Sequence, residues 1–308
     1  MPEGELGVIR RQDDDDAFAK QHGAPAPIPR SGHEVSPLKT LIIGASGLVG
    51  GALRAVFPDA VGTYFRSPGT ALVPLDISDA GRVQDLVTQV APELILLPAA
   101  QPNVDRCETD EAESERINVA GTRHVAAAAA AVGARLVFFS TDYVFDGKAG
   151  PYAPDAAPAP INVYGRHKLA AETIVRQTVA DHLIVRACGI YGYQAAGKNF
   201  VMALARLAAA GEPMRVPSDQ WGTPTLAENL AAAVHELALS GHRGIVHPVG
   251  PDYLTRIDFA RLAAAVFGHD TAFLQAVATP ALQQPAARPL RGGLDNRSTQ
   301  ALLRKTRL

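Results

Sequence analysis

Short apolar runs alternate along most of the chain with longer segments whose apolar residues recur every three or four positions. From Leu38 onward, the short runs predict strands at residues 40–43, 61–64, 71–75, 94–97, 136–139 and 183–186. The segments between them predict helices, among them an alanine-rich helix over residues 113–132 that Gly133 would end. This alternation specifies an α/β fold with a parallel, doubly wound (Rossmann) sheet.

The pattern loosens after residue 190, where it predicts a smaller group of elements. These are helices at 200–210 and 226–239, a short strand at 244–247, and a helix that begins after Thr255 and has Asp258 in its first turn. We therefore expect a core over residues 38–190 and a smaller C-terminal lobe over 191–308, joined as one integrated domain.

Residues 1–37 have a different composition from the remainder. Four consecutive aspartates at 13–16 precede an Ala- and Pro-rich stretch at 23–29, with few apolar residues to pack. The segment lacks the basic start and apolar run of a signal peptide. It is expected to be a flexible N-terminal extension. A partner-binding arm and a misassigned start codon are the alternatives.

Composition narrows the class of protein. The 308 residues carry a net charge of −2 and a pI near 6.5, so no nucleic-acid or membrane-surface partner is indicated. No apolar stretch approaches the roughly 20 residues that span a bilayer. Cys107 and Cys188 form no disulfide framework, which favours a reducing, cytoplasmic location. The nine histidines show no ligand spacing, so no metal site is expected.

A glycine-rich turn follows the first predicted strand. Gly44, Gly47 and Gly50 lie in the sequence GASGLVG, directly before a predicted helix. Such glycines allow a tight turn and a close approach to a pyrophosphate, which the N–H groups and dipole of the helix attract. A glycine-rich turn alone is commonly only a turn. The strand and helix around this one make residues 38–190 a candidate NAD(P)-binding core.

A second pattern supplies candidate chemistry. Tyr164 and Lys168 are four residues apart, so on a helix they share one face. A lysine ammonium near a phenol lowers a pKa that starts near about 10 and makes the tyrosine a proton donor and acceptor. Thr141 follows a predicted strand, where its hydroxyl can reach a substrate carbonyl. The alternative is a Tyr–Lys pair on a solvated helix face.

These motifs resemble those of the extended short-chain dehydrogenase/reductases. The similarity is to the branch that contains dTDP-4-dehydrorhamnose reductases and the regulatory β subunit of methionine adenosyltransferase. It rests on GASGLVG (44–50), STDYVFDG (140–147), NVYGRHK (162–168) and DQWGTPT (219–225), and it extends from Leu38 to the C-terminus. The chain departs from the reductases in two loops, since residues 186–192 lack a tryptophan and residues 101–108 lack a threonine.

The resemblance implies roles for particular residues and for the C-terminal lobe, which would bind the substrate. The implied catalytic residues are Thr141, Tyr164 and Lys168. The implied cofactor-binding residues are Gly44, Ser46, Gly47, Leu48, Val49, Asp76, Ala99 and Ala100, together with Tyr164 and Lys168. The implied substrate-binding residues are Asn103, Tyr143 and Arg288. Alternatively, Asp76 caps the helix that follows it and Tyr143 packs behind a strand.

The end of the second strand bears on the choice of cofactor. An NAD site usually has a carboxylate there, about 20 residues past the first glycine. Residues 62–67 contain no carboxylate, whereas Arg66 can face a 2′-phosphate. NADPH is therefore the expected cofactor, with NADH as the alternative. A solvated loop arginine is the other interpretation of Arg66.

Taken with these patterns, the resemblance implies an NADPH-dependent reductase of a nucleotide-linked 4-keto-6-deoxy sugar. Tyr164 would deliver a proton while the cofactor supplies the hydride. An NADP-binding regulatory subunit and a nucleotide-sugar epimerase or dehydratase are the alternatives. The expected partners are the nucleotide-sugar substrate and either a second copy of the chain or a partner enzyme.

Overall fold

The computed structural model describes residues 38–194 and 199–308. Residues 38–308 form one compact unit. The prediction of a flexible N-terminal extension concerns residues outside the described ranges.

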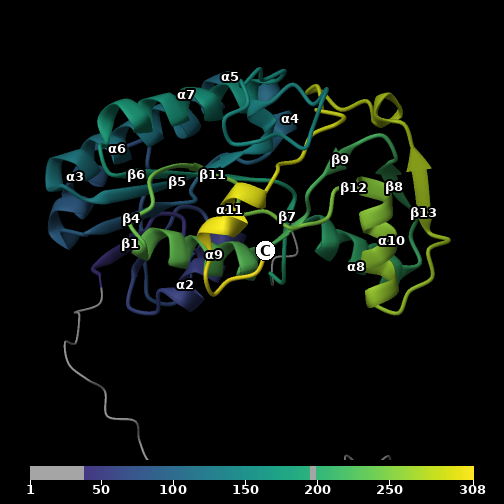
Figure 1. Ribbon diagram of the computed structural model, residues 1–308, viewed down its shortest axis with the longest axis horizontal. Coiled ribbons are helices and arrows are strands. Elements are labelled where there is room, and N and C mark those ends of the chain that lie inside the picture. The colour runs from purple at the N-terminus through teal and green to yellow at the C-terminus, as the bar shows by residue number, and fades with distance from the viewer. Residues whose placement is uncertain (1–37, 195–198) are drawn as a thin grey trace, which may run out of the picture. The chain divides into compact units, whose positions relative to one another are not determined.

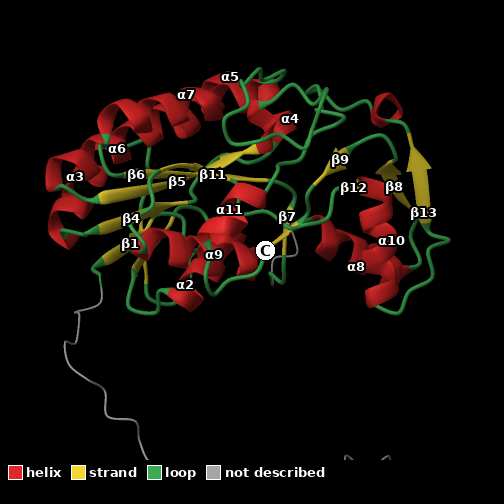
Figure 2. Ribbon diagram, in the orientation of Figure 1, coloured by secondary structure: helices red, strands yellow, loops and turns green. Residues whose placement is uncertain are grey.

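A seven-stranded parallel sheet forms the centre of the fold (Figures 1 and 2). Its strands, in the spatial order β11-β6-β5-β4-β1-β2-β3, are Gly244–Val246, His182–Ala187, Arg135–Thr141, Leu94–Leu97, Thr40–Ile42, Val61–Tyr64 and Leu72–Pro74. The strand order reverses between β1 and β4, where ligands bind in open sheets of this kind. The predicted doubly wound Rossmann sheet is confirmed.

Helices cover both faces of this sheet (Figure 2). One face carries α3 (Ala80–Val90), α6 (Gly121–Val132) and α7 (Val163–Thr178), and the other carries α2 (Leu48–Val56) and α9 (Ala227–Leu239). Alternate residues of a strand enter opposite cores: Leu136 and Phe138 pack on the first face, Val137 and Phe139 on the second. Burial on both faces explains why these strands are continuous apolar runs.

The prediction of an alanine-rich helix over 113–132 is confirmed, but the helix is not regular throughout. After α4 (Val104–Thr109), the chain is helical without a break through α5 (Glu111–Ser114), a π-helical turn η1 (Glu115–Ala120) and α6. The wide turn buries three consecutive residues, Ile117, Asn118 and Val119, which a regular helix on a core surface does not do. Gly133, at φ +70°, ends α6 as predicted.

The C-terminal part contributes to both the sheet and a separate lobe. In that lobe α8 (Phe200–Ala210) and α10 (Arg256–Val266) pack beside the parallel pair β8 (Met214–Pro217) and β13 (Leu274–Val277). Thr255 caps α10 as predicted, because its hydroxyl oxygen accepts from the Asp258 N–H at 3.1 Å. By contrast, β11 and α9 belong to the central layers.

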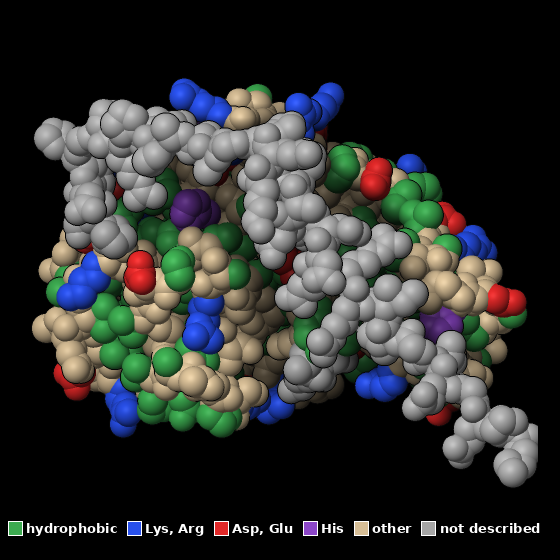
Figure 3. Space-filling model, turned by 90° about the horizontal axis from the view of Figure 1, so that it is seen from below, with side chains coloured by type: hydrophobic (Ala, Val, Ile, Leu, Met, Phe, Trp, Pro, Cys, Tyr) green, Lys and Arg blue, Asp and Glu red, His purple; other side chains and the backbone are tan. Residues whose placement is uncertain are grey.

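The remaining elements are short. They are η2 (Asp142–Val144), β7 (Ile190–Tyr191), β9 (Trp221–Gly222), β10 (Thr225–Leu226), β12 (Leu254–Thr255), η3 (Thr279–Leu282) and α11 (Arg297–Leu302). On the face seen in Figure 3, basic and acidic side chains are both scattered among apolar and neutral atoms. Within residues 38–194 and 199–308, no helix is long and apolar enough to cross a membrane.

Candidate active site

The glycine turn after β1 has the geometry of a dinucleotide cradle. Gly44 has φ +99°, and a Cβ there would lie 2.9 Å from the Ala99 backbone. A Cβ on Gly50 would lie 2.1 Å from the Gly44 oxygen, so α2 packs directly on the turn. Gly47 is the N-cap of α2 and forms no side-chain cap, and a Cβ added to it would meet only the Gly44 carbonyl oxygen, at 3.5 Å. The helix N-terminus is therefore open to an anion such as a pyrophosphate.

The other predicted cofactor residues surround this turn. Ser46 lies within it, and Leu48 and Val49 are the first residues of α2. Ala99 and Ala100 follow β4, the strand next to β1 in the sheet. Asn118 fixes the position of Gln101, the residue after Ala100. The side-chain oxygen of Asn118 accepts from the backbone N–H of Gln101 at 2.9 Å, and its side-chain amide donates to the backbone carbonyl of Gln101 at 3.1 Å.

The predicted catalytic residues come together at the end of β5. Thr141 is the last residue of that strand, and Tyr164 lies in the first turn of α7, which Asn162 caps. A Cβ on Gly165 would lie 2.1 Å from the backbone carbonyl oxygen of Tyr143, so α7 approaches η2 closely. The rings of Tyr143 and Tyr164 consequently meet edge to face, 5.9 Å apart.

The expectation that Lys168 lowers the pKa of Tyr164 is wrong for this arrangement. Burial raises the pKa of Tyr164, and the nearby Thr141 hydroxyl opposes that effect only in part. The Lys168 ammonium instead lies 4.0 Å from the centre of the Phe138 ring. Burial lowers the pKa of Lys168 to about 7, although the negative charge of Glu172 acts to raise it. Tyr164 therefore stays protonated at neutral pH, as a proton donor must.

A buried ion pair lies behind these residues. The Arg186 guanidinium donates to Glu172 from Nε at 2.9 Å and from Nη2 at 2.7 Å, and the Ser140 hydroxyl donates to the same carboxylate at 2.5 Å. Arg186 is 2% exposed and Glu172 is fully buried. Sequence reasoning missed Glu172, although it follows Lys168 by four residues and so lies on the same face of α7.

His247 lies at the rear of this ion pair and gives a pH-dependent prediction. The ring is fully buried, and its Nδ1 lies 3.1 Å from the backbone carbonyl oxygen of Tyr152. Burial and the Arg186 charge lower its pKa to about 3. Since the unfolded value is about 6.5, the stabilisation from neutral His247 is complete above that pH and is lost as pH falls toward the folded value.

We therefore expect the free energy of unfolding of the wild type to decrease more than that of His247→Gln between about pH 7 and about pH 4. Urea unfolding at several pH values measures this difference. His269→Gln, at a ring that is not fully buried, is the matched control and should follow the wild type. Identical pH slopes in all three proteins would contradict the prediction.

A cavity of about 170 Å³ lies next to the predicted catalytic residues, since Tyr143, which packs on Tyr164, lines it. Its lining includes Asp142, Tyr143, Cys188, Gly189, Phe200, Trp221, Arg256 and Phe259. The loop that lacks the tryptophan of the resembling reductases supplies Cys188 and Gly189. Burial, followed by the Asp142 charge, raises the pKa of Tyr143 to about 12. The cavity thus combines aromatic walls with a protonated phenol and an arginine, a set suited to a polar molecule with a planar ring.

The predicted substrate-binding residues differ in their surroundings. Tyr143 lines the cavity. Asn103 caps α4 by accepting from the Arg106 N–H at 2.9 Å. Arg288 donates to Asp105 at 2.6 Å, so one edge of its guanidinium is already bound within the protein.

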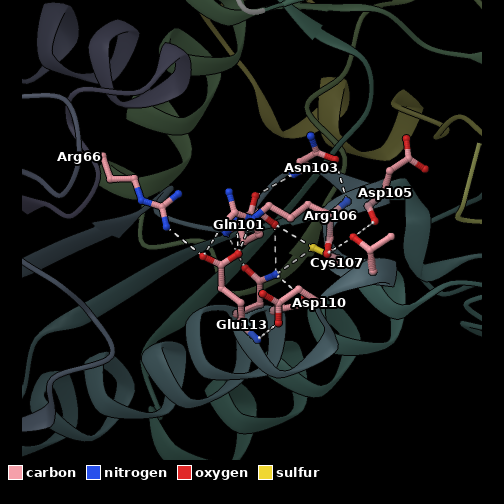
Figure 4. A network of polar contacts seen from close by, with 11 residues as sticks. Arg66, Gln101, Asn103, Asp105, Arg106, Cys107, Asp110 and Glu113 are labelled. Carbon is pink, nitrogen blue, oxygen red and sulfur yellow. Dashed lines mark hydrogen bonds and ion pairs between the residues drawn. The ribbon is translucent and has the colours of Figure 1, made fainter.

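Two residues of the predicted cofactor set have partners that the sequence did not indicate. The alternative that Asp76 caps a helix is wrong, because Asp79 caps α3 while Asp76 accepts from the N–H and hydroxyl of Ser78. Arg66 is not simply solvated, since its Nη2 donates to Glu113 at 2.9 Å. Figure 4 shows this contact, with Arg66 reaching Glu113 from a separate segment.

The parallel sheet, the glycine turn, and the positions of Thr141 at the end of β5 and of Tyr164 and Lys168 on α7 are those of a short-chain dehydrogenase/reductase. A family model described as RmlD substrate binding domain matches residues 38–307. The chain belongs to this family, and the resemblance seen in its sequence is confirmed.

Relatives of known name agree with this assignment. A dTDP-4-dehydrorhamnose reductase of Streptomyces griseus is 37% identical over 262 residues, which are 83% of this chain and 84% of the relative. The probable low-salt glycan biosynthesis reductase Agl14 of Haloferax volcanii is 34% identical, over 82% of this chain and 88% of the relative. The crystal structure of dTDP-4-dehydrorhamnose reductase from Bacillus anthracis in complex with NADP has a TM-score of 0.80 at 30% identity, covering 86% of this chain and 92% of that one.

Proposed function

We propose that the protein is an NADPH-dependent reductase of a nucleotide-linked 4-keto-6-deoxy sugar, with dTDP-4-dehydrorhamnose as the leading substrate. The observation that carries the proposal is the position of three residues at the sheet edge that also carries the glycine turn: Thr141 ends β5, and Tyr164 and Lys168 share one face of α7. Tyr143, which packs against Tyr164, lines the aromatic cavity. The names of its relatives support the same reaction. The NADP bound to the related Bacillus anthracis structure supports the cofactor.

Each residue of the set has a separate task. NADPH supplies the hydride when bound, held by the glycine turn, by the loop at Ala99 and Ala100, and by Lys168. Tyr164 donates its phenolic proton to the oxygen of the ketone as charge develops there. Thr141 offers a hydroxyl hydrogen bond to the same oxygen. Lys168 adds a buried positive charge near the reacting groups in its protonated form.

A panel of nucleotide-linked 4-keto sugars, with NADPH consumption as the readout, tests the proposal. The protein alone should oxidise NADPH with at least one member of the panel. A regulatory subunit, one of the two alternatives that the sequence leaves open, would show no turnover and would bind a larger enzyme stoichiometrically. The mass of the purified protein in solution tests the predicted homodimer in the same preparation.

Arg66 gives a prediction about cofactor choice. Replacing it with alanine should weaken NADPH binding by about 1.5 kcal/mol, the lower end for a charged hydrogen bond, because its side chain is 55% exposed. NADH binding should be unchanged, since NADH carries no 2′-phosphate. Titration by nicotinamide fluorescence measures both affinities. Equal NADPH and NADH affinities in the wild type would refute the role given to Arg66.

A further inference from the structure

The carboxylate of Glu113 lies between two arginines (Figure 4). Arg106 donates to it twice, from Nε at 2.5 Å and from Nη2 at 2.8 Å. Arg66 donates once, from Nη2 at 2.9 Å, and the Gln101 amide donates at 3.2 Å. Each carboxylate oxygen therefore accepts two hydrogen bonds, which fills its acceptor sites.

The two arginines are held unequally. Arg106 forms the bidentate contact that neutralises Glu113, and it belongs to α4, directly before α5. Arg66 uses one of its five N–H donors on Glu113, and no other side-chain hydrogen bond joins it to a described residue. Its side chain is 55% exposed, whereas that of Glu113 is 11% exposed. Arg66 is thus the less firmly held of the two arginines. Because Arg106 already neutralises Glu113, the charge of Arg66 is the one that the carboxylate leaves unbalanced.

The contact also has a definite place in the fold. Arg66 follows β2, and Glu113 lies on α5, beyond the end of β4. In the sheet β1 lies between β2 and β4, and its C-terminal end carries the glycine turn. The Arg66–Glu113 pair therefore joins the two segments on either side of that turn. An anion that binds next to the turn on the β2 side has to share Arg66 with Glu113.

We propose that Glu113 is an internal competitor for Arg66 and thereby limits the preference of the site for a dinucleotide with a 2′-phosphate. The inference rests on the proposed NADPH-binding function. The phosphate gains the Arg66 guanidinium only when the contact to Glu113 is given up, while Glu113 keeps Arg106 and Gln101. A dinucleotide without the phosphate leaves the pair as it is. Glu113 is accordingly a specificity-determining residue for the cofactor.

The experiment compares the affinities of the full-length protein for NADPH and NADH by fluorescence titration, which requires no turnover. Glu113→Gln keeps an oxygen that can accept from Arg106 but removes the charge. It should tighten NADPH binding by about three- to fivefold, the value of a partly exposed ion pair, and leave NADH binding unchanged. In an Arg66→Ala background the same change should have no effect. The matched control is Glu115→Gln, at an exposed carboxylate two residues away, which should behave as the wild type.

Four results would overturn the inference. Weaker NADPH binding in Glu113→Gln would mean that Glu113 positions Arg66 rather than competing for it, and unchanged binding would mean that it does neither. An equal gain in Glu115→Gln, or a gain that persists without Arg66, would mean a general charge effect. A wild type that binds neither dinucleotide would defeat the proposed function and this inference together. A wild type that binds NADPH normally, with no tightening in Glu113→Gln, would defeat only the inference.

Discussion

Tyr164→Phe should lower turnover by about 10² to 10⁴, the usual contribution of a positioned acid, on whichever sugar of the panel proves to be the substrate. The phenyl ring fills nearly the same volume, so the edge-to-face contact with Tyr143 at 5.9 Å should persist. NADPH affinity should stay near that of the wild type, because Lys168 and the glycine turn are untouched. Steady-state kinetics and a parallel fluorescence titration separate the two effects.

The control for this variant is Tyr191→Phe, in β7, whose ring packs on Phe259 at 5.0 Å rather than beside Thr141. It should keep turnover close to that of the wild type. Because burial holds the pKa of Tyr164 above its usual value, the donor is protonated across the neutral range and ionisation of Tyr164 should not limit the rate there. Wild-type turnover in Tyr164→Phe would exclude Tyr164 as the proton donor.

The central strands could be predicted from the sequence because they are buried on both faces. Residues 94–97 form a strand with the predicted bounds, and all four are buried, as an apolar run between two helical layers requires. The α8 helix was equally readable, because Gly211 at φ +67° ends it. The π turn at 115–120 was not, because it depends on tertiary contacts of Asn118 that leave no periodic signal.

The candidate site could be predicted from the sequence where a short motif fixes the spacing of its residues. It could not be predicted where ion pairs join residues that are far apart in the sequence. Tyr164 and Lys168 lie on one helix, so their separation alone put them on one face. Their electrostatics followed from burial, which raises the pKa of Tyr164 and lowers that of Lys168. The Arg66–Glu113 contact joins residues 47 positions apart, and no local pattern encodes it.

The second large effect is expected at the buried ion pair. Arg186→Met should lower the free energy of unfolding by about 3–5 kcal/mol, because it leaves the fully buried Glu172 carboxylate without its bidentate partner. The Ser140 hydroxyl at 2.5 Å cannot replace a guanidinium charge. Urea unfolding measures the difference. Arg261→Met, which breaks the exposed pair with Asp258, is the matched control and should cost at most about 1 kcal/mol.

The double variant Arg186→Met/Glu172→Met separates two effects of Arg186→Met: the loss of the ion pair and the cost of leaving the Glu172 carboxylate buried without a partner. Removing both charges together should recover much of the stability that Arg186→Met loses, since apolar residues of similar length replace a buried pair with little net cost. The same variant should still lose activity, because the Glu172 charge opposes the effect of burial on Lys168. Without that charge, the pKa of Lys168 should fall further below about 7, and less of the lysine would be protonated at neutral pH. The activity of the double variant should therefore recover toward lower pH, whereas an ion pair that serves packing alone would leave the pH profile unchanged.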